Sequence, residues 1–179
     1  MRPDPAIRFS TSDRQTVIRR QNGITKFIPS CRCPWSRLFL IADAGAAPSL
    51  PASLNGFVHY STSNYGGKIS DKYVQKTSIQ ALQSGKTLPY GTAVVGIEYR
   101  DQNGKRGPVL RYIIMEKVRN GGKDYPASVR NGDWEFASFT PARALITNDP
   151  VTRCLACHKS QAQSDYLFGL NEMKSYKLK

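Results

Sequence analysis

The sequence predicts an α+β protein in which an antiparallel β-sheet predominates and the helices are short. Segments rich in Val, Ile and Tyr alternate with turn-forming stretches of Gly, Asn and Asp through the middle of the chain. The segments with helical character span only two to three turns, and glycine or proline stands near their ends. Together, these patterns indicate a sheet of about five strands with helices at its margins.

Five segments share β-branched or aromatic residues and have the length of ordinary strands. They are residues 57–60, 68–74, 92–100, 109–117 and 134–139. A Gly-rich stretch that contains Gly66-Gly67 separates the first two, and Asn103-Gly104 lies between the third and the fourth. Because such pairs adopt the turns that join antiparallel strands, two hairpins are expected.

Short helices are expected over residues 78–84 and 150–162. Gly85 stands just past the end of the first, where a left-handed residue commonly ends a helix. The second has a proline in its first turn, and Asp149 or Thr147 precedes it as a candidate N-cap. This second helix is the C-terminal helix of the predicted fold.

The chain divides into a leader and one domain. Residues 1–46 are expected to be a disordered leader or signal-like extension, and residues 47–179 a single domain. Leu38-Phe39-Leu40-Ile41-Ala42 is apolar, and Ala44-Gly45-Ala46 has the small residues of a cleavage site, although Asp43 interrupts the pattern. A mis-assigned start is the alternative explanation. No stretch has the 18 consecutive apolar residues of a membrane span, so none is expected.

The formal net charge of +13 is scattered over both parts of the chain rather than gathered in one patch. Neither a run of five like charges nor a basic helix is present, so nucleic acid is not an expected partner. A basic surface of this kind suits an acidic redox partner or an anionic membrane face.

The chemistry is concentrated in Cys154-Leu155-Ala156-Cys157-His158, which matches the pattern for attachment of a c-type haem. In such a site two thiols add to the haem vinyl groups, and the adjacent imidazole binds the iron. The spacing suits one helical turn, because residues three and four apart lie on the same side of a helix. A redox dithiol or half of a zinc site is the alternative, but no second pair of ligands at zinc spacing accompanies the motif. Cys31-Arg32-Cys33 has too short a spacing for haem and is assigned no function.

The sixth coordination position of the iron has three candidate ligands, His59, Met115 and Met173. His59 and Met115 lie in predicted strands and would serve equally well as structural residues, and Met173 lies in a terminal tail. An open or water-bound distal site is therefore the preferred expectation.

The order of several segments resembles the cytochrome P-460 family over roughly residues 57–170. The segments are Lys72-Tyr73-Val74, Leu88-Pro89-Tyr90-Gly91-Thr92, Tyr125-Pro126, Asn131-Gly132-Asp133-Trp134-Glu135-Phe136, Cys154 to His158, and Asp165-Tyr166-Leu167-Phe168. The resemblance implies a sheet-dominated protein related to cytochrome c-prime-beta, periplasmic and often dimeric. It further implies one covalent haem c, a proximal histidine, and a distal face that binds nitric oxide or a similar small nitrogen ligand.

The family members that oxidise hydroxylamine carry a lysine cross-linked to the porphyrin, and the matching position here is Gly96. Hydroxylamine oxidation is therefore the second hypothesis, after ligand binding, and electron transfer is the third. Gly96, Glu98, Met115 and Phe136 are the candidates for the distal pocket. Glu98 shares a strand face with Gly96 and is a candidate catalytic proton relay. A carboxylate that faces solvent and pairs with a nearby Lys or Arg is its alternative role.

Overall fold

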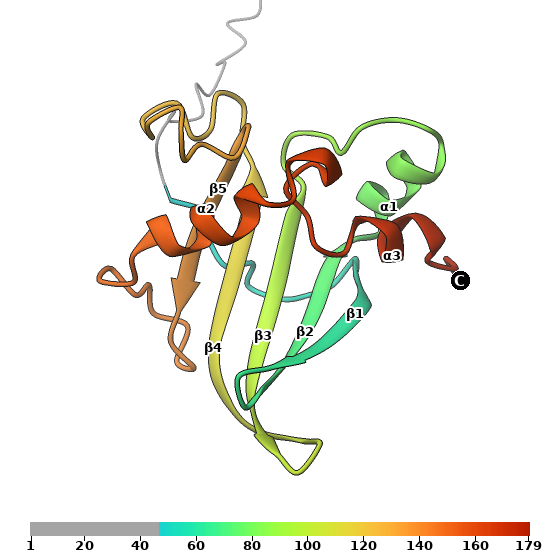
Figure 1. Cartoon of the computed structure of the whole chain (residues 1–179). Coiled ribbons are helices and arrows are strands. Elements are labelled where there is room, and N and C mark those ends of the chain that lie inside the picture. Colours follow the sequence, from blue (N-terminus) through green and yellow to red (C-terminus); the bar gives the residue numbers. More distant parts are fainter. Residues whose placement is uncertain (1–46) are drawn as a thin grey trace, which may run out of the picture. The chain divides into compact units, whose positions relative to one another are not determined.

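The computed structural model describes residues 47–179, and the predicted leader with Cys31-Arg32-Cys33 lies outside the described residues. In the described part, five strands form one antiparallel sheet in the order β1-β2-β3-β4-β5 (Figure 1). The strands are β1 (Phe57–Tyr65), β2 (Lys68–Gln75), β3 (Ala93–Gln102), β4 (Lys105–Lys117) and β5 (Trp134–Phe139). Each strand pairs with its neighbour in the sequence. The predicted α+β class is confirmed.

The two predicted hairpins are present, and glycine makes both turns possible. Gly66 and Gly67 have φ values of 54° and 72°, and Asn103 and Gly104 have φ values of 55° and 82°. Both central residues of each turn are thus left-handed, a geometry that matches the twist of the flanking strands. The strands extend closer to these turns than predicted, and β1 continues to Tyr65, which pairs with Lys68.

Four short helical segments accompany the sheet: α1 (Lys76–Gln83), α2 (Val151–Lys159), a 3-10 helix over Ala162–Ser164, and α3 (Leu170–Ser175). The motif-bearing helix is shorter than predicted, because the chain changes to the 3-10 helix after Lys159. No side chain caps α2, and Asp149 forms an ion pair with Arg111 instead. The sequence pattern did not predict α3, which is only six residues long.

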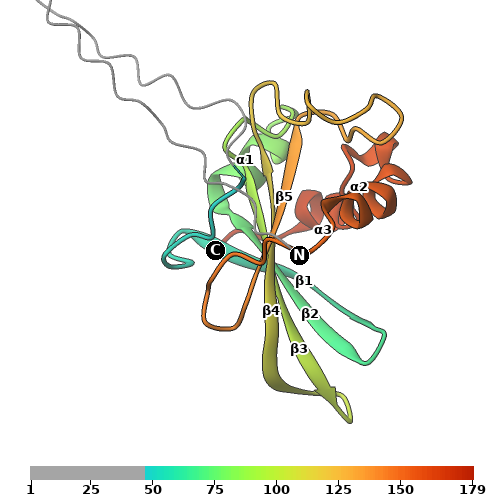
Figure 2. The same cartoon turned by 90° about the vertical axis from the view of Figure 1, so that its left-hand side faces the viewer.

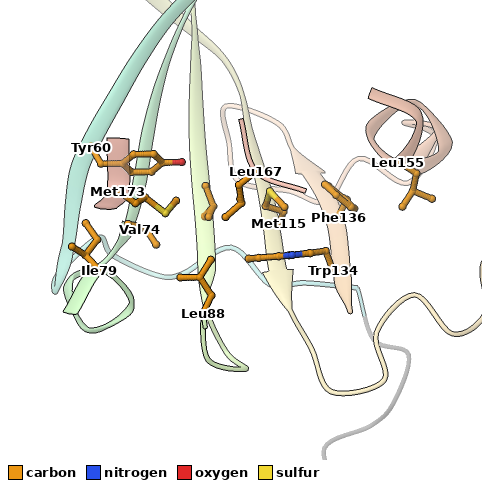
Figure 3. Close-up of a cluster of buried hydrophobic side chains, with 11 residues drawn as sticks. Tyr60, Val74, Ile79, Leu88, Met115, Trp134, Phe136, Leu155, Leu167 and Met173 are labelled. Carbon is orange, nitrogen blue, oxygen red and sulfur yellow. The ribbon is translucent and has the colours of Figure 1, made fainter. Parts of the chain in front are cut away.

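Apolar side chains pack on both faces of the sheet. One buried cluster lies between the sheet and the helices (Figure 3), and its members are Tyr60, Val74, Ile79, Leu88, Val94, Met115, Trp134, Phe136, Leu155, Leu167 and Met173. A second cluster on the other face contains Val95 and Ile114, against which Leu50 and Leu54 of the segment before β1 pack. Adjacent residues of a strand point to opposite faces, so Val94 and Val95 belong to different clusters.

The helices lie toward one end of the sheet. α2 and α3 lie on the same side of it, as the two perpendicular views show together (Figures 1 and 2). At the other end, no helix of the described chain crosses β2, β3 and β4 (Figure 1). On the face of the sheet that packs against the helices, the next row of residues beyond the buried cluster consists of Lys72, Gly96 and Ile113. Lys72 pairs with Gly96, and Gly96 pairs with Ile113. We call this face of the sheet the helix side. No helix among residues 47–179 has the length and apolar character needed to cross a bilayer.

Candidate functional site

Helix α2 places the three residues of the attachment motif within one turn and a half. Both cysteines are free thiols; Cys154 is half-buried and Cys157 is exposed. His158 is half-buried and directly follows Cys157. Because positions three and four residues apart are neighbours on a helix surface, Cys154 lies beside both Cys157 and His158.

Apolar residues of α2 next to the motif attach it to the core. Leu155 is fully buried in the cluster on the helix side, and Val151, one turn earlier, packs against the same cluster. The side-chain amide of Asn131, which is fully buried, donates a hydrogen bond to the carbonyl oxygen of Leu155 at 3.1 Å. This bond connects the loop before β5 to the middle of α2. The thiols and the imidazole therefore lie on a helix whose position is fixed by the core and by the hydrogen bond from Asn131.

The orientation of His158 is set by a backbone carbonyl. Its Nδ1 lies 2.7 Å from the carbonyl oxygen of Tyr166, which can only accept, so Nδ1 carries the proton. Asp165 and Tyr166 both have positive φ values, 50° and 62°, in the turn that brings this carbonyl to the ring. Nε2 is then left with its lone pair, which is the form of imidazole that binds a metal.

Burial lowers the pKa of His158, and the nearby charge of Lys72 lowers it further, against the opposing effect of the Tyr166 carbonyl. A neutral ring at neutral pH follows from this direction, because the pKa moves away from the physiological range. The local environment therefore favours the protonation state that iron coordination requires.

Aromatic rings flank the imidazole on two sides. The ring centroids of Phe136 and Phe168 each lie 5.1 Å from that of His158. Phe136 is buried in β5, but Phe168 is 50% exposed. A large aromatic ring left in solvent beside a candidate ligand atom is the surface that a flat apolar group would cover. The thiols, the neutral imidazole and this ring together fit a covalently held porphyrin.

A cavity of about 230 Å³ borders the motif on the side of β5. Phe136 and Ser138 of β5, Leu145 and Asp149 of the following loop, and Cys154 of α2 contribute to its lining. The wall is largely apolar, which is typical of a site for an organic group. Part of the space next to the first cysteine is thus already shaped by the protein.

Glu98 lies on the helix side of β3 at the centre of a network of polar residues. Its side chain is fully buried, and it accepts hydrogen bonds from Tyr65, from Lys68 at 3.3 Å and from Arg111 at 2.7 Å. Arg111 in turn pairs with Asp149 at 2.9 Å. The predicted pairing with Lys and Arg is therefore present, but the carboxylate is buried and does not face solvent.

This network keeps Glu98 ionised. Burial by itself raises the pKa of Glu98, but the hydrogen bonds from Arg111 and Tyr65 and the charge of Lys68 outweigh it, so the pKa is below its ordinary value. Both carboxylate oxygens have partners. A role for Glu98 in proton transfer stays a prediction, and the contacts describe a structural carboxylate.

Gly96 faces the helix side as expected, but the space above it is occupied. A Cβ atom at this position would lie 2.5 Å from Cγ1 of Ile113, on the neighbouring strand β4. Real Cβ atoms do not approach so closely, so Ile113 would have to move before any side chain could be accommodated here. The position of the family's cross-linking lysine is thus covered by an isoleucine.

The three candidates for a second axial ligand are not gathered at the site. Met115 and Met173 belong to the buried cluster, with 6% and 0% of their surface exposed. His59 contacts the ring of Tyr73 and lies 3.4 Å from Asp71, residues that alternate with Lys72 and therefore point to the other face of the sheet. Of the predicted residues, the structure brings Phe136 next to His158 and leaves His59 on the far face.

Sequence reasoning missed three contributors to the site: Tyr166, Phe168 and Lys72. All three lie in segments that carried part of the family resemblance, the first two in Asp165–Phe168 and Lys72 in Lys72-Tyr73-Val74. Tyr166 contributes its backbone carbonyl, a group that every residue has. Its role could therefore not be predicted from the residue type. Lys72 had a weak signal, because it alternates along its strand with Val74 and Ser70, which are buried on that face.

Fold and site together define a class: a sheet-dominated protein that carries a CxxCH haem-attachment motif on a C-terminal helix. The family model for Cytochrome P460 matches residues 55–169, which is more than half of the chain. The chain belongs to the cytochrome P460 family, whose members are haem-binding cytochromes. No curated protein matches the chain.

Proposed function

We propose that this protein is a c-type cytochrome with one haem c joined covalently to Cys154 and Cys157, and with His158 as the axial ligand of its iron. The observation that carries the proposal is the geometry of α2, which presents two free thiols and a neutral, oriented imidazole together. The haem, when bound, supplies an iron that takes a small ligand. The protein holds the thiols in register and fixes the imidazole through the Tyr166 carbonyl.

We further propose that the distal side is open and binds nitric oxide or a similar small nitrogen ligand. Support comes from the placement of the alternative ligands, because His59 lies on the other face of the sheet and Met173 of α3 is fully buried in the cluster on the helix side. Met115 is likewise packed in the cluster next to Phe136. Electron transfer with two fixed axial ligands has less support for the same reason.

Hydroxylamine oxidation is the second candidate, and two contacts weigh against it. Ile113 covers Gly96, where the family's cross-linking lysine would stand. Glu98, the candidate proton acceptor, is held ionised by Arg111, Lys68 and Tyr65. A carboxylate with a lowered pKa is a weak base, so its use as a proton acceptor would be inefficient.

Covalent attachment of haem belongs to an oxidising, exported compartment, so we propose a periplasmic location. The basic composition supports an acidic protein as redox partner, because opposite charges steer encounter over long distances. A homodimer is proposed from the family alone.

The test is expression with export and haem maturation, followed by denaturing electrophoresis with haem detection. The wild-type chain should retain haem after denaturation, and the Cys154→Ser, Cys157→Ser double variant should lose it. Ser160→Ala, at the end of the same helix, is the matched control and should retain haem. Wild-type protein that carries no covalent haem under these conditions would overturn the proposal.

Absorption spectra then test the ligand. The ferrous protein should be high-spin and five-coordinate, should change on addition of nitric oxide, and should not be reduced by hydroxylamine. Steady reduction by hydroxylamine would favour the oxidase. A low-spin, six-coordinate ferrous spectrum without added ligand would favour electron transfer.

A further inference from the structure

Lys72 brings a positive charge to the helix side of the sheet next to the candidate site. Its Cα pairs with Gly96 across β2 and β3, two positions along from the pair Val74 and Val94. Val74 belongs to the buried cluster that contains Leu155 of α2. Since alternate residues of a strand share a face, Lys72 emerges on the side where α2 lies.

No carboxylate among residues 47–179 lies within ion-pair distance of the ammonium group of Lys72. Burial lowers the pKa of Lys72, and the charges of Glu172 and Asp71 oppose this effect from a greater distance. The Nζ atom of Lys72 donates a hydrogen bond to the hydroxyl oxygen of Ser63 at 2.7 Å, and the side chain is half-buried. Other lysines on this side are paired: Lys68 with Glu98 at 3.3 Å and Lys117 with Asp165 at 2.7 Å. A half-buried ammonium with only a hydroxyl acceptor retains hydrogen-bonding capacity, because it has three donors.

Two further observations bear on where this capacity lies. Val74, the next residue of β2 on the face of Lys72, packs in the same buried cluster as Leu155 of α2, the helix that carries His158. Ser70, two residues earlier on the same face, is only 1% exposed, and its hydroxyl oxygen would lie 3.8 Å from a Cβ atom at Gly96, the residue with which Lys72 pairs. Strand β2 therefore places an ammonium with free donors and a buried hydroxyl on the helix side of the sheet, beside Gly96.

We propose that Lys72 determines ligand specificity at the haem site, where its ammonium group favours small anions and ligands with negative charge on their outer atom over neutral ligands. The inference rests on the proposed function, because it needs a haem held by Cys154, Cys157 and His158. Hydrogen bonds to a charged group are roughly twice as strong as those between neutral groups, and a partly buried site weakens them less than water does. The preference for anionic ligands would then come from the charge of Lys72 in addition to that of the iron.

The experiment compares ligand affinities of the ferric holoprotein by absorption titration. Azide is the anionic probe and imidazole the neutral probe, each measured with wild type, Lys72→Met and Lys72→Arg. Lys72→Met should weaken azide binding by about 10- to 100-fold, the range expected for one charge-assisted hydrogen bond, and should leave imidazole binding unchanged. Lys72→Arg should retain a large part of the azide affinity, because it keeps the charge.

The matched control is Lys105→Met at the exposed hairpin between β3 and β4, which removes the same charge away from the site. It should leave both affinities unchanged. A second readout is the C–O stretching frequency of the ferrous carbon monoxide complex, which should rise in Lys72→Met because a positive charge near the bound ligand has been removed. Far-UV circular dichroism checks that each variant folds.

Three results would overturn the inference. Equal loss of azide and imidazole affinity would mean a structural role, and no change in either would mean that the ammonium does not reach the ligand. A covalent link between Lys72 and the haem, or a low-spin wild type that turns high-spin in Lys72→Met, would mean a bond to the cofactor. Failure of the proposed function is distinguishable, since wild-type protein would then carry no covalent haem for titration.

Discussion

Glu98 illustrates how opposing effects decide the state of one buried residue. Its carboxylate loses water on burial, which disfavours the charged form, yet Arg111 and Tyr65 restore more than burial removes. The Arg111 side chain stays 27% exposed and also reaches Asp149 at 2.9 Å. The negative charge of Glu98 is therefore compensated by the positive charges of Arg111 and Lys68. The network joins β1, β2, β3, β4 and the segment before α2.

Glu98→Gln should lower the free energy of unfolding of the holoprotein by about 3 kcal/mol, because it leaves Arg111 partly buried with one of its two carboxylate partners removed. Chemical denaturation monitored by circular dichroism measures the change. Glu172→Gln, an exposed Glu on α3, should cost far less. Loss of less than 1 kcal/mol in Glu98→Gln would show that the ion pair contributes little.

The same residue predicts a pH dependence. The pKa of Glu98 is lower in the folded protein than its ordinary value of 4.5, so the stabilisation is fully present above that pH and is lost as the pH falls through the folded value. Denaturation between pH 7 and pH 3 should show a decline below about pH 4.5 that is shallower in Glu98→Gln. Parallel profiles for the two proteins would contradict the assignment.

At the scale of elements, Asp165 connects the segment after α2 to the sheet. Its carboxylate accepts a hydrogen bond from Lys117 of β4 at 2.7 Å and one from Nε1 of Trp134 of β5 at 3.2 Å. The next residue, Tyr166, supplies the carbonyl that orients His158. One side chain therefore positions the turn on which the orientation of the candidate iron ligand depends.

Asp165→Ala should lower the free energy of unfolding by about 2 kcal/mol, because two hydrogen bonds to a charged group are lost. It should also shift the iron–histidine stretching band in the resonance Raman spectrum of the ferrous holoprotein, since the Tyr166 carbonyl is no longer held. Asp124→Ala, in an exposed loop, is the control and should change neither quantity. An unchanged Raman band in Asp165→Ala would separate Asp165 from the orientation of His158.

At the scale of the whole molecule, the core on the helix side joins segments from both ends of the described chain. Tyr60 of β1 and Met173 of α3 belong to the same cluster as Leu155 of α2 (Figure 3). Met173 is fully buried, although it lies only six residues from the C-terminus. The terminal segment is thus part of the core and not a frayed tail.

Met173→Ala should destabilise the protein by about 2–4 kcal/mol, because a fully buried side chain is replaced by a cavity. Thermal or chemical unfolding of the holoprotein measures the effect. Leu145→Ala provides the control, since 46% of Leu145 is exposed, and its cost should be below 1 kcal/mol in order of magnitude. A similar cost for both variants would indicate that α3 contributes little to the core.

Much of the fold was accessible from sequence, because its determinants are local. Gly66-Gly67 and Asn103-Gly104 favour left-handed turns wherever they occur, and the alternation along β3 assigns Val94 and Val95 to opposite faces. Helix α3 was not predicted because six residues are too few to show a helical period. Its stability comes from tertiary packing, since Met173 is fully buried in the core.

The sequence by itself determined the α+β class, the two hairpins, the attachment motif and its place on a C-terminal helix. Spacing within one helical turn is a local property, so Cys154, Cys157 and His158 could be chosen as candidates without a structure. Only the tertiary structure decided where distant groups lie relative to them: the Tyr166 carbonyl bonds to His158, and the ammonium of Lys72 emerges on the side of the sheet where α2 packs. The physical reason is that a backbone carbonyl is the same in every residue, and that the face of a strand acquires its partners only when the helices pack on it.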